Sequence, residues 1–133
     1  MKIKRIEHVA IAVNDMADSM KILENIFGFE LELEEKIGST SLAMYPIGET
    51  YIELLESDDP KSKINGLLSE KEQSLYHLCF EVDDIEEALD ELREKGVKLL
   101  DEKPRIGHGG AKIAFLNPES TGDILIELAE LSH

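Results

Sequence analysis

The chain contains two copies of one sequence pattern, and this internal repeat restricts the folds it can adopt. Residues 6–35, IEHVAIAVNDMADSMKILENIFGFELELEE, align with residues 75–103, LYHLCFEVDDIEEALDELREKGVKLLDEK. Each copy begins with a strand-like run that carries a histidine, His8 or His77. Both halves also end on nearly the same strand, YIELLE in the first and LIELAE in the second. A unit of about 55 residues has too little core to be stable alone, so the two copies should pack together.

Each copy is expected to fold as a βαβββ unit. Asp15 and Asp84 follow the histidine strands and are suited to cap helices whose apolar positions recur with helical spacing. Gly28 and Gly96 stand where a helix commonly ends in a left-handed residue. The apolar helix positions are Met16, Met20, Leu23 and Phe27 in the first copy and Ile85, Leu89 and Leu92 in the second. The strands expected after the two glycines are residues 29–34, 40–45, 50–55, 98–101, 111–116 and 124–128.

The repeat predicts a single α+β domain that spans residues 1–133. Two tandem βαβββ modules, about 1–57 and about 74–131, would form a curved mixed sheet around a metal-binding cleft. Residues 58–73 are interpreted as a linker with one short helix around residues 64–69. Because one fold can host several activities, the function has to be argued from particular side chains.

The charge of the chain argues against nucleic acid as a partner. The sequence has 29 acidic and 14 basic residues and a formal net charge of −15, and such a surface repels a phosphate backbone. Cys79 is the one cysteine, which excludes an intramolecular disulfide and favours an intracellular, cytoplasmic protein. No segment approaches the roughly 20 apolar residues that span a bilayer, so no membrane partner is expected.

Four side chains are unusual for ordinary strands. Strand alternation places His8 and His77 on faces opposite to the large aliphatic residues of their strands. Glu53 and Glu127 stand in mid-strand between aliphatic residues, where a carboxylate is costly to bury unless it is paired or metal-bound. A single histidine or glutamate in a strand is more commonly structural or solvent-exposed, but here both exceptions recur at matched positions. Two imidazoles and two carboxylates suit a divalent ion such as Zn²⁺, Co²⁺, Ni²⁺ or Mn²⁺.

These features together resemble the vicinal oxygen chelate (glyoxalase/bleomycin resistance/dioxygenase) superfamily, and most of all its methylmalonyl-CoA epimerase branch. The resemblance covers about residues 4–130. It rests on IEHVAIAV with FGFELELEE, on IELLES, and on VDDIEEALDELREKGVKLLDEKPRIGHGGAKIAFLNPES leading into LIEL. The stretch DEKPRIG-x-GG-x-KIAF at residues 101–115 is the part most typical of the branch.

The resemblance implies a metal-dependent enzyme that inverts C2 of methylmalonyl-CoA through a metal-stabilised enediolate. It implies that the metal ligands are His8, Glu53, His77 and Glu127. Glu127 would also be one of the two groups that carry protons to and from C2. The family places a second acidic carrier on the strand at residues 40–45, where this chain has Leu42, so a water is an alternative.

The resemblance also implies an acyl-CoA substrate and a homodimer. Arg105 and Lys112 are the candidates for binding the anionic groups of such a substrate. His108, in a glycine-rich loop, would contact substrate or gate the cleft, and an exposed side chain without a role is the alternative.

Two other functions remain open from the sequence. A glyoxalase I-like lyase would use an equivalent ligand set on a thiol–methylglyoxal hemithioacetal. A non-catalytic protein would bind a small molecule in the cleft, and relatives of that kind lack the metal ligands. The binding of a divalent metal and the choice between CoA thioesters and hemithioacetals would separate the three.

Overall fold

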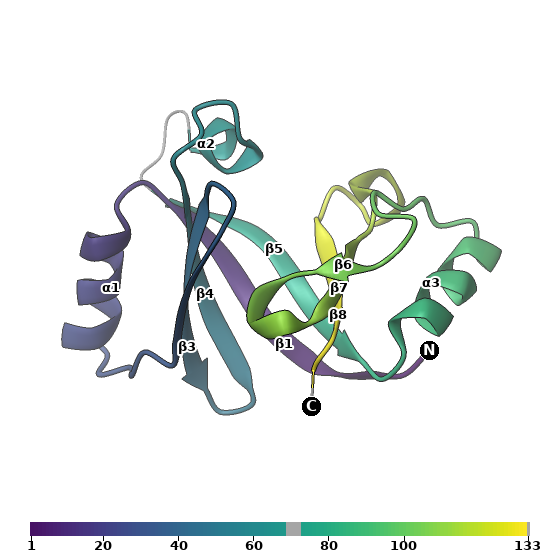
Figure 1. The fold of residues 1–133 in the computed structure, drawn as a ribbon, viewed down its shortest axis with the longest axis horizontal. Coiled ribbons are helices and arrows are strands. Elements are labelled where there is room, and N and C mark those ends of the chain that lie inside the picture. The colour runs from purple at the N-terminus through teal and green to yellow at the C-terminus, as the bar shows by residue number, and fades with distance from the viewer. Residues whose placement is uncertain (69–72, 133) are drawn as a thin grey trace. The chain divides into compact units, whose positions relative to one another are not determined.

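The computed structural model describes residues 1–68 and 73–132, and within them the βαβββ order occurs twice (Figure 1). The first copy comprises β1 (Ile3–Val13), α1 (Met16–Asn25), β2 (Leu33–Ile37), β3 (Thr40–Ile47) and β4 (Thr50–Ser57). The second comprises β5 (Gln73–Val82), α3 (Ile85–Glu94), β6 (Arg105–Ile106), β7 (Lys112–Phe115) and β8 (Ile126–Glu130). Between and around these lie α2 (Lys63–Leu67) and the short 3-10 helices η1 (His108–Gly110) and η2 (Pro118–Ser120). The predicted α+β class and repeated βαβββ order are confirmed.

The chain divides into two compact units that are offset from the sequence repeats. Unit one comprises Met1–Glu7 and His77–His133, and unit two comprises His8–Tyr76. The long strands β1 and β5 therefore each contribute to both units: β1 enters unit two at His8, and β5 enters unit one at His77. The two histidines singled out by the repeat are the residues at which these strands change unit.

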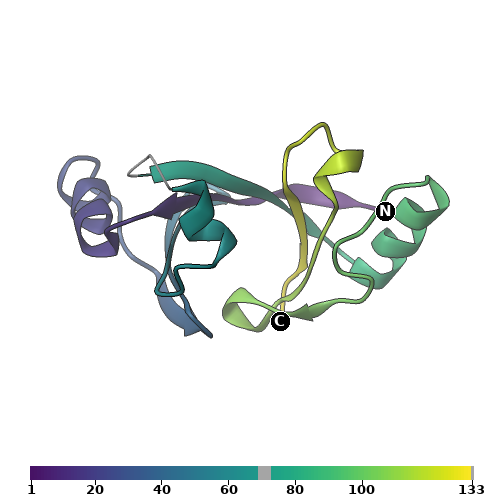
Figure 2. The same ribbon diagram turned by 90° about the horizontal axis from the view of Figure 1, so that it is seen from above.

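Unit two is a mixed sheet with the strand order β2-β3-β4-β1. Strand β1 runs parallel to β4, whereas β3 is antiparallel to both of its neighbours. Helix α1 covers one face (Figure 2). On this face, Met16, Met20 and Leu23 pack against a cluster that includes Val13 and Leu54. Helix α2 packs against the other face. Its cluster contains Ala10, Ala12, Leu42, Met44, Leu55, Ile64 and Leu68.

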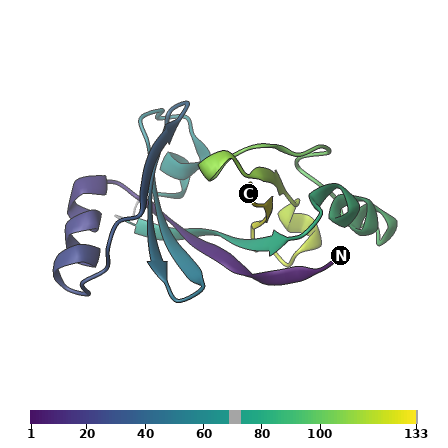
Figure 3. The ribbon, with the colours of Figure 1, turned by 60° about the horizontal axis from the view of Figure 1, so that its bottom comes forward.

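Unit one repeats this arrangement with the order β5-β8-β7-β6. Strand β5 is parallel to β8, and β7 is antiparallel to β8 and β6. Helix α3 covers one face (Figure 3), where Ile85, Leu89 and Leu92 belong to a buried cluster with Val82 and Leu128. A second cluster on the other face contains Cys79, Ala111, Ile113 and Ala129. In each unit the longer helix, α1 or α3, thus covers one face of the sheet, and in unit two the short helix α2 packs against the other.

The predicted helix boundaries are confirmed at their starts. The carboxylate of Asp15 accepts from the backbone N–H of Asp18 at 3.0 Å, and that of Asp84 accepts from the N–H of Glu87 at 3.1 Å. Gly28 and Gly96 have φ of 69° and 80°, the left-handed conformation expected after a helix end. The helix expected around residues 64–69 is α2, and Ser69 lies outside the described residues.

Replacing Asp84 with alanine is expected to lower the free energy of unfolding by about 1 kcal/mol, because the helix loses its N-terminal acceptor. Denaturant midpoints would measure the change. The neighbouring Asp83→Ala serves as a control, since Asp83 is exposed and does not cap α3, and its effect should stay within about 0.5 kcal/mol. Equal losses in the two variants would contradict the capping role.

Two strand predictions are wrong. Strand β2 begins at Leu33 instead of residue 29, because Phe29 packs in the cluster beneath α1. No strand covers residues 98–101 within the described chain: Leu99 packs against the α3 cluster and forms only an isolated bridge with Leu116. The edge strand of unit one is instead β6, which pairs with β7. In both copies, the segment after the glycine packs against the helix, and the strand of the sheet begins later in the chain.

The assignment of Phe27 to the buried helix face is also wrong. Helix α1 ends at Asn25, so Phe27 no longer follows the helical spacing, and 61% of its surface is exposed. Its ring stacks on Phe29, with the ring centroids 5.6 Å apart. Among the described residues, we find no helix with the length and apolar character required to cross a membrane.

Candidate active site

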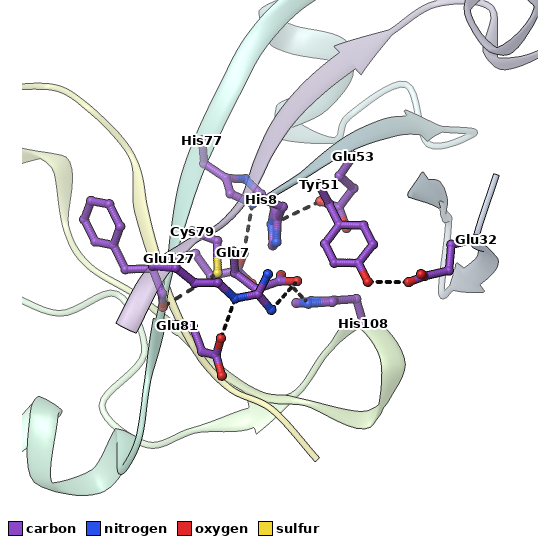
Figure 4. Close-up of polar contacts among 12 residues, drawn as sticks. Glu7, His8, Glu32, Tyr51, Glu53, His77, Cys79, Glu81, His108 and Glu127 are labelled. Carbon is purple, nitrogen blue, oxygen red and sulfur yellow. Dashed lines mark hydrogen bonds and ion pairs between the residues drawn. The ribbon is translucent and has the colours of Figure 1, made fainter. Parts of the chain in front are cut away.

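Unit two positions His8 beside Glu53. The two residues lie on the parallel strands β1 and β4, whose register pairs Ala10 with Glu53. His8 Nε2 lies 3.3 Å from Glu53 Oε1 (Figure 4), and the two residues are 0% and 3% exposed. An imidazole and a carboxylate are thus buried together on the sheet face opposite α1.

Unit one positions His77 beside Glu127 in the same way. These residues lie on the parallel strands β5 and β8, whose register pairs Cys79 with Glu127. His77 Nε2 is 2.9 Å from Glu127 Oε1, and both side chains are buried. The pair lies on the face opposite α3.

The two pairs have the same strand register. In each unit, the residue two positions after the histidine is the cross-strand partner of the glutamate. The third strand then places an apolar residue beside the glutamate, Met44 in unit two and Phe115 in unit one. The two sequence copies therefore place their histidine and glutamate in the same way. Unrelated occurrences of the two residue types would not be expected to share this register.

The distances within each pair fit two donors of one cation. Two ligand atoms that each lie about 2.1 Å from an ion are roughly 3 to 3.4 Å apart at tetrahedral or octahedral angles. The Nε2–Oε1 distances of 2.9 and 3.3 Å agree with that spacing. His8, His77 and Glu127 also belong to the buried groups whose donor atoms could hold a metal ion. Burial makes a charged carboxylate costly, and a bound cation would offset that cost.

The surroundings of His77 include an exposed cation. The ring of Phe115 meets the His77 imidazole edge-on, with centroids 5.1 Å apart and planes at 88°. The guanidinium of Arg105 lies over the Phe115 ring, 5.6 Å from the ring centroid, and the Arg105 Nε contacts Asp101 at 3.2 Å. The Arg105 side chain is 55% exposed and can reach an anion in solution.

Lys112 lies on the opposite face of the sheet from the His77–Glu127 pair. On β7, Lys112 alternates with Ile113 and Phe115, which lie on the face of Glu127. Lys112 instead contacts Glu130 at 3.9 Å, and Glu130 accepts from the N–H of Ile85 at the start of α3. Lys112 therefore lies on the helix-covered face of unit one, away from the His77–Glu127 pair.

His108 is buried beside a carboxylate. Its Nε2 lies 2.8 Å from Glu7 Oε1, and the two residues are 7% and 2% exposed. Glu7 is in turn near Arg5, at 4.0 Å, and Arg5 Nε donates to Glu81 at 2.6 Å. The alternative expectation of an exposed His108 is wrong. The pairing with Glu7 was not predicted, because regular alternation along β1 places Glu7 with the aliphatic residues.

A second feature that the sequence did not reveal lies near His8. Tyr51 is the cross-strand partner of His8, and it shares the face of Glu53 because it stands two residues earlier on β4. The Tyr51 hydroxyl donates to the carboxylate of Glu32 (Figure 4). The backbone N–H of Glu32 donates to the carbonyl of Met44 at 3.0 Å, which holds Glu32 beside the row that contains Glu53.

The chain is similar to a known protein family and to several of its members. The family model described as Glyoxalase/Bleomycin resistance protein/Dioxygenase superfamily matches residues 7–115. An uncharacterized Bacillus subtilis protein is 33% identical over 128 residues, covering 95% of this chain and 91% of its own length. An ethylmalonyl-CoA/methylmalonyl-CoA epimerase of Cereibacter sphaeroides is 33% identical over 133 residues, covering 97% and 99%.

A solved structure is similar over nearly the whole fold. The methylmalonyl-CoA epimerase of Streptomyces coelicolor in complex with 2-nitronate-propionyl-CoA superposes with a TM-score of 0.93 and 28% sequence identity. The match covers 99% of this chain and 100% of the other.

Proposed function

Because the chain belongs to the Glyoxalase/Bleomycin resistance protein/Dioxygenase superfamily, we propose that it is a metal-dependent epimerase that inverts C2 of methylmalonyl-CoA. The observation that carries this proposal is the repeated His–Glu pair, buried in matched register in both units. The epimerases among its relatives and structural neighbours support this choice of substrate.

The proposed ligands of one divalent ion are His8, Glu53, His77 and Glu127. Each pair supplies an imidazole nitrogen and a carboxylate oxygen at the separation expected for donors of one ion. When bound, the ion would stabilise negative charge that develops on the thioester oxygen as C2 loses its proton. Zn²⁺, Co²⁺, Ni²⁺ and Mn²⁺ all accept such a set of nitrogen and oxygen ligands.

Glu127 is proposed to remove the C2 proton on one face of the substrate. A carboxylate is a competent base for this step when it is held within hydrogen-bond reach of the carbon acid and shielded from water. Glu127 satisfies the second condition, since only 3% of its surface is exposed. The His77 imidazole lies beside it, with Nε2 2.9 Å from the carboxylate oxygen.

Arg105 is proposed to bind an anionic group of the substrate. The chain carries a formal net charge of −15, so an acyl-CoA needs local positive charge to approach it. Arg105 is exposed, is oriented by the Phe115 ring, and belongs to the same unit as Glu127. Lys112, which faces α3, is not assigned this role.

The decisive measurement is proton NMR of methylmalonyl-CoA in D₂O with metal-loaded protein and with a chelator-treated control. We expect the C2 proton to exchange with solvent and the two epimers to interconvert. Both processes should stop on chelation and return when a divalent metal is added back. Metal-loaded protein that exchanges no C2 proton would refute the epimerase. Isomerisation of a hemithioacetal by that same sample would instead identify the glyoxalase I-like lyase.

A further inference from the structure

Arg105 is held in place by two neighbours on the sheet face of unit one that bears Glu127. Its cross-strand partner is Ile113, which shares that face with Phe115. Its guanidinium lies over the Phe115 ring, 5.6 Å from the centroid, and its Nε donates to Asp101 Oδ1 at 3.2 Å. A guanidinium that lies over a ring and donates to a carboxylate has lost much of its rotational freedom before a ligand binds.

Asp101 is itself fixed by Phe115. Its Oδ2 accepts from the backbone N–H of Phe115 at 2.8 Å, and its own N–H donates to the Phe115 carbonyl at 3.2 Å. Asp101 therefore connects the backbone of β7 to the Nε of Arg105. A guanidinium has several N–H donors, and within the described part of the chain the carboxylate contact of Arg105 engages Nε, so the two terminal amino groups can donate to a ligand.

These terminal groups lie close to the His77–Glu127 pair. Phe115 is the cross-strand partner of Glu127, and its ring contacts the His77 imidazole, with centroids 5.1 Å apart. Arg105 and the pair thus contact the same phenyl ring. In methylmalonyl-CoA the carboxylate is bonded directly to C2, whereas the phosphates lie beyond the whole pantetheine arm. With C2 held beside Glu127, the acyl carboxylate is the anionic group of the substrate that is kept close to Arg105.

Another arginine of unit one, Arg5, already lies between two carboxylates. Its Nε donates to Glu81 at 2.6 Å, and its Nη2 lies 4.0 Å from Glu7. Both glutamates are buried, and the Arg5 side chain is 24% exposed, against 55% for Arg105. Arg105 is therefore the better placed of the two for a carboxylate that arrives from solution.

We propose that Arg105, oriented by Asp101 and Phe115, binds the acyl carboxylate of the substrate through its terminal amino groups, and that this contact selects thioesters with a carboxylate on C2 over plain acyl thioesters. The inference rests on the proposed epimerase function and names the anionic group that Arg105 binds. The contact offsets the repulsion between the acidic chain and the carboxylate, and it orients the substituents of C2 beside Glu127. Asp101 is a positioning residue, because it acts through the guanidinium.

The test measures the binding of two ligands to metal-loaded protein by isothermal titration calorimetry. Malonyl-CoA and acetyl-CoA share the thioester and the CoA portion and differ in the carboxylate. The variant is Arg105→Met, which removes the charge and keeps an unbranched side chain over Phe115. We expect it to weaken malonyl-CoA binding by about 10- to 100-fold, because charge-assisted hydrogen bonds to the carboxylate are lost. Acetyl-CoA binding should stay within about threefold of wild type.

Lys103→Met is the matched control, since it removes the same charge two residues earlier in the chain. Lys103 lines a hollow beside α3, so both ligands should bind this variant as they bind wild type. Asp101→Asn keeps an oxygen for the N–H of Phe115 but removes the charge that holds Arg105. It should weaken malonyl-CoA binding by about 3- to 10-fold and spare acetyl-CoA, a difference between the ligands that a merely structural role would not produce.

Equal weakening of both ligands in Arg105→Met, with unchanged circular dichroism, would assign the guanidinium to the CoA phosphates and overturn the proposal. Unchanged malonyl-CoA binding would overturn it as well. Arg105→Lys keeps the charge but not the paired amino groups, and its affinity for malonyl-CoA should lie between those of wild type and Arg105→Met. Failure of the proposed function is seen separately, since wild-type protein would then exchange no C2 proton of methylmalonyl-CoA before any variant is made.

Discussion

Replacing Glu127 with glutamine is expected to lower the rate of C2 proton exchange in methylmalonyl-CoA by about 10²- to 10⁴-fold, because the carboxamide cannot accept the proton. The substitution keeps the size of the side chain and one oxygen at the position 2.9 Å from His77 Nε2. The loss should therefore exceed any loss of metal. Exchange rates from NMR would be compared with the metal content of the same samples.

Glu130→Gln is the matched control, since it makes the same change on the same strand. Glu130 points to the other face of β8, where its carboxylate accepts from the backbone N–H of Ile85 at the start of α3. A glutamine oxygen can still accept that hydrogen bond, so exchange should stay near the wild-type rate. If Glu127→Gln retained its metal and exchanged the C2 proton at the rate of Glu130→Gln, Glu127 would not be the base.

Replacing His108 with alanine is expected to lower the free energy of unfolding by about 3 kcal/mol, because it leaves the buried carboxylate of Glu7 without its contact to the imidazole. Glu7, 2% exposed, would lose its contact at 2.8 Å, and the guanidinium of Arg5 lies farther from its carboxylate, at 4.0 Å. Denaturant unfolding measures the change. The double variant Glu7→Gln with His108→Ala should recover part of the loss, since the neutral amide is less costly to bury than a carboxylate.

Lys98→Ala provides the comparison for an exposed ion pair. Lys98 contacts Glu119 at 3.1 Å, but both side chains are more than half exposed. Solvent screens such a pair, and its loss should cost less than about 1 kcal/mol. A His108→Ala variant no less stable than Lys98→Ala would show that the Glu7–His108 contact contributes little to the fold.

The strand positions of the two His–Glu pairs could be predicted because each pair belongs to a short sequence pattern that occurs twice in the chain. Each histidine precedes a helix cap by seven residues, and each glutamate interrupts an aliphatic strand at the same place in its copy. Strand alternation then decides which face they occupy, and the observed registers agree with it. The same reasoning failed for residues 29–34 and 98–101, where apolar side chains cover a helix instead of alternating across a sheet.

The sequence by itself determined the duplicated βαβββ order, the apolar faces of the helices and the strand faces of the two His–Glu pairs. These features follow from the spacing of residues that are close together in the chain. Only the tertiary structure decided the contacts that join separate segments. Tyr51 meets Glu32 because β2 begins four residues later than its pattern predicts. Glu7 meets His108 because β1 passes from one unit to the other between Glu7 and His8, so two consecutive side chains are both buried. Such contacts depend on where a strand starts and where it changes unit, and alternation along a single strand contains no information about either.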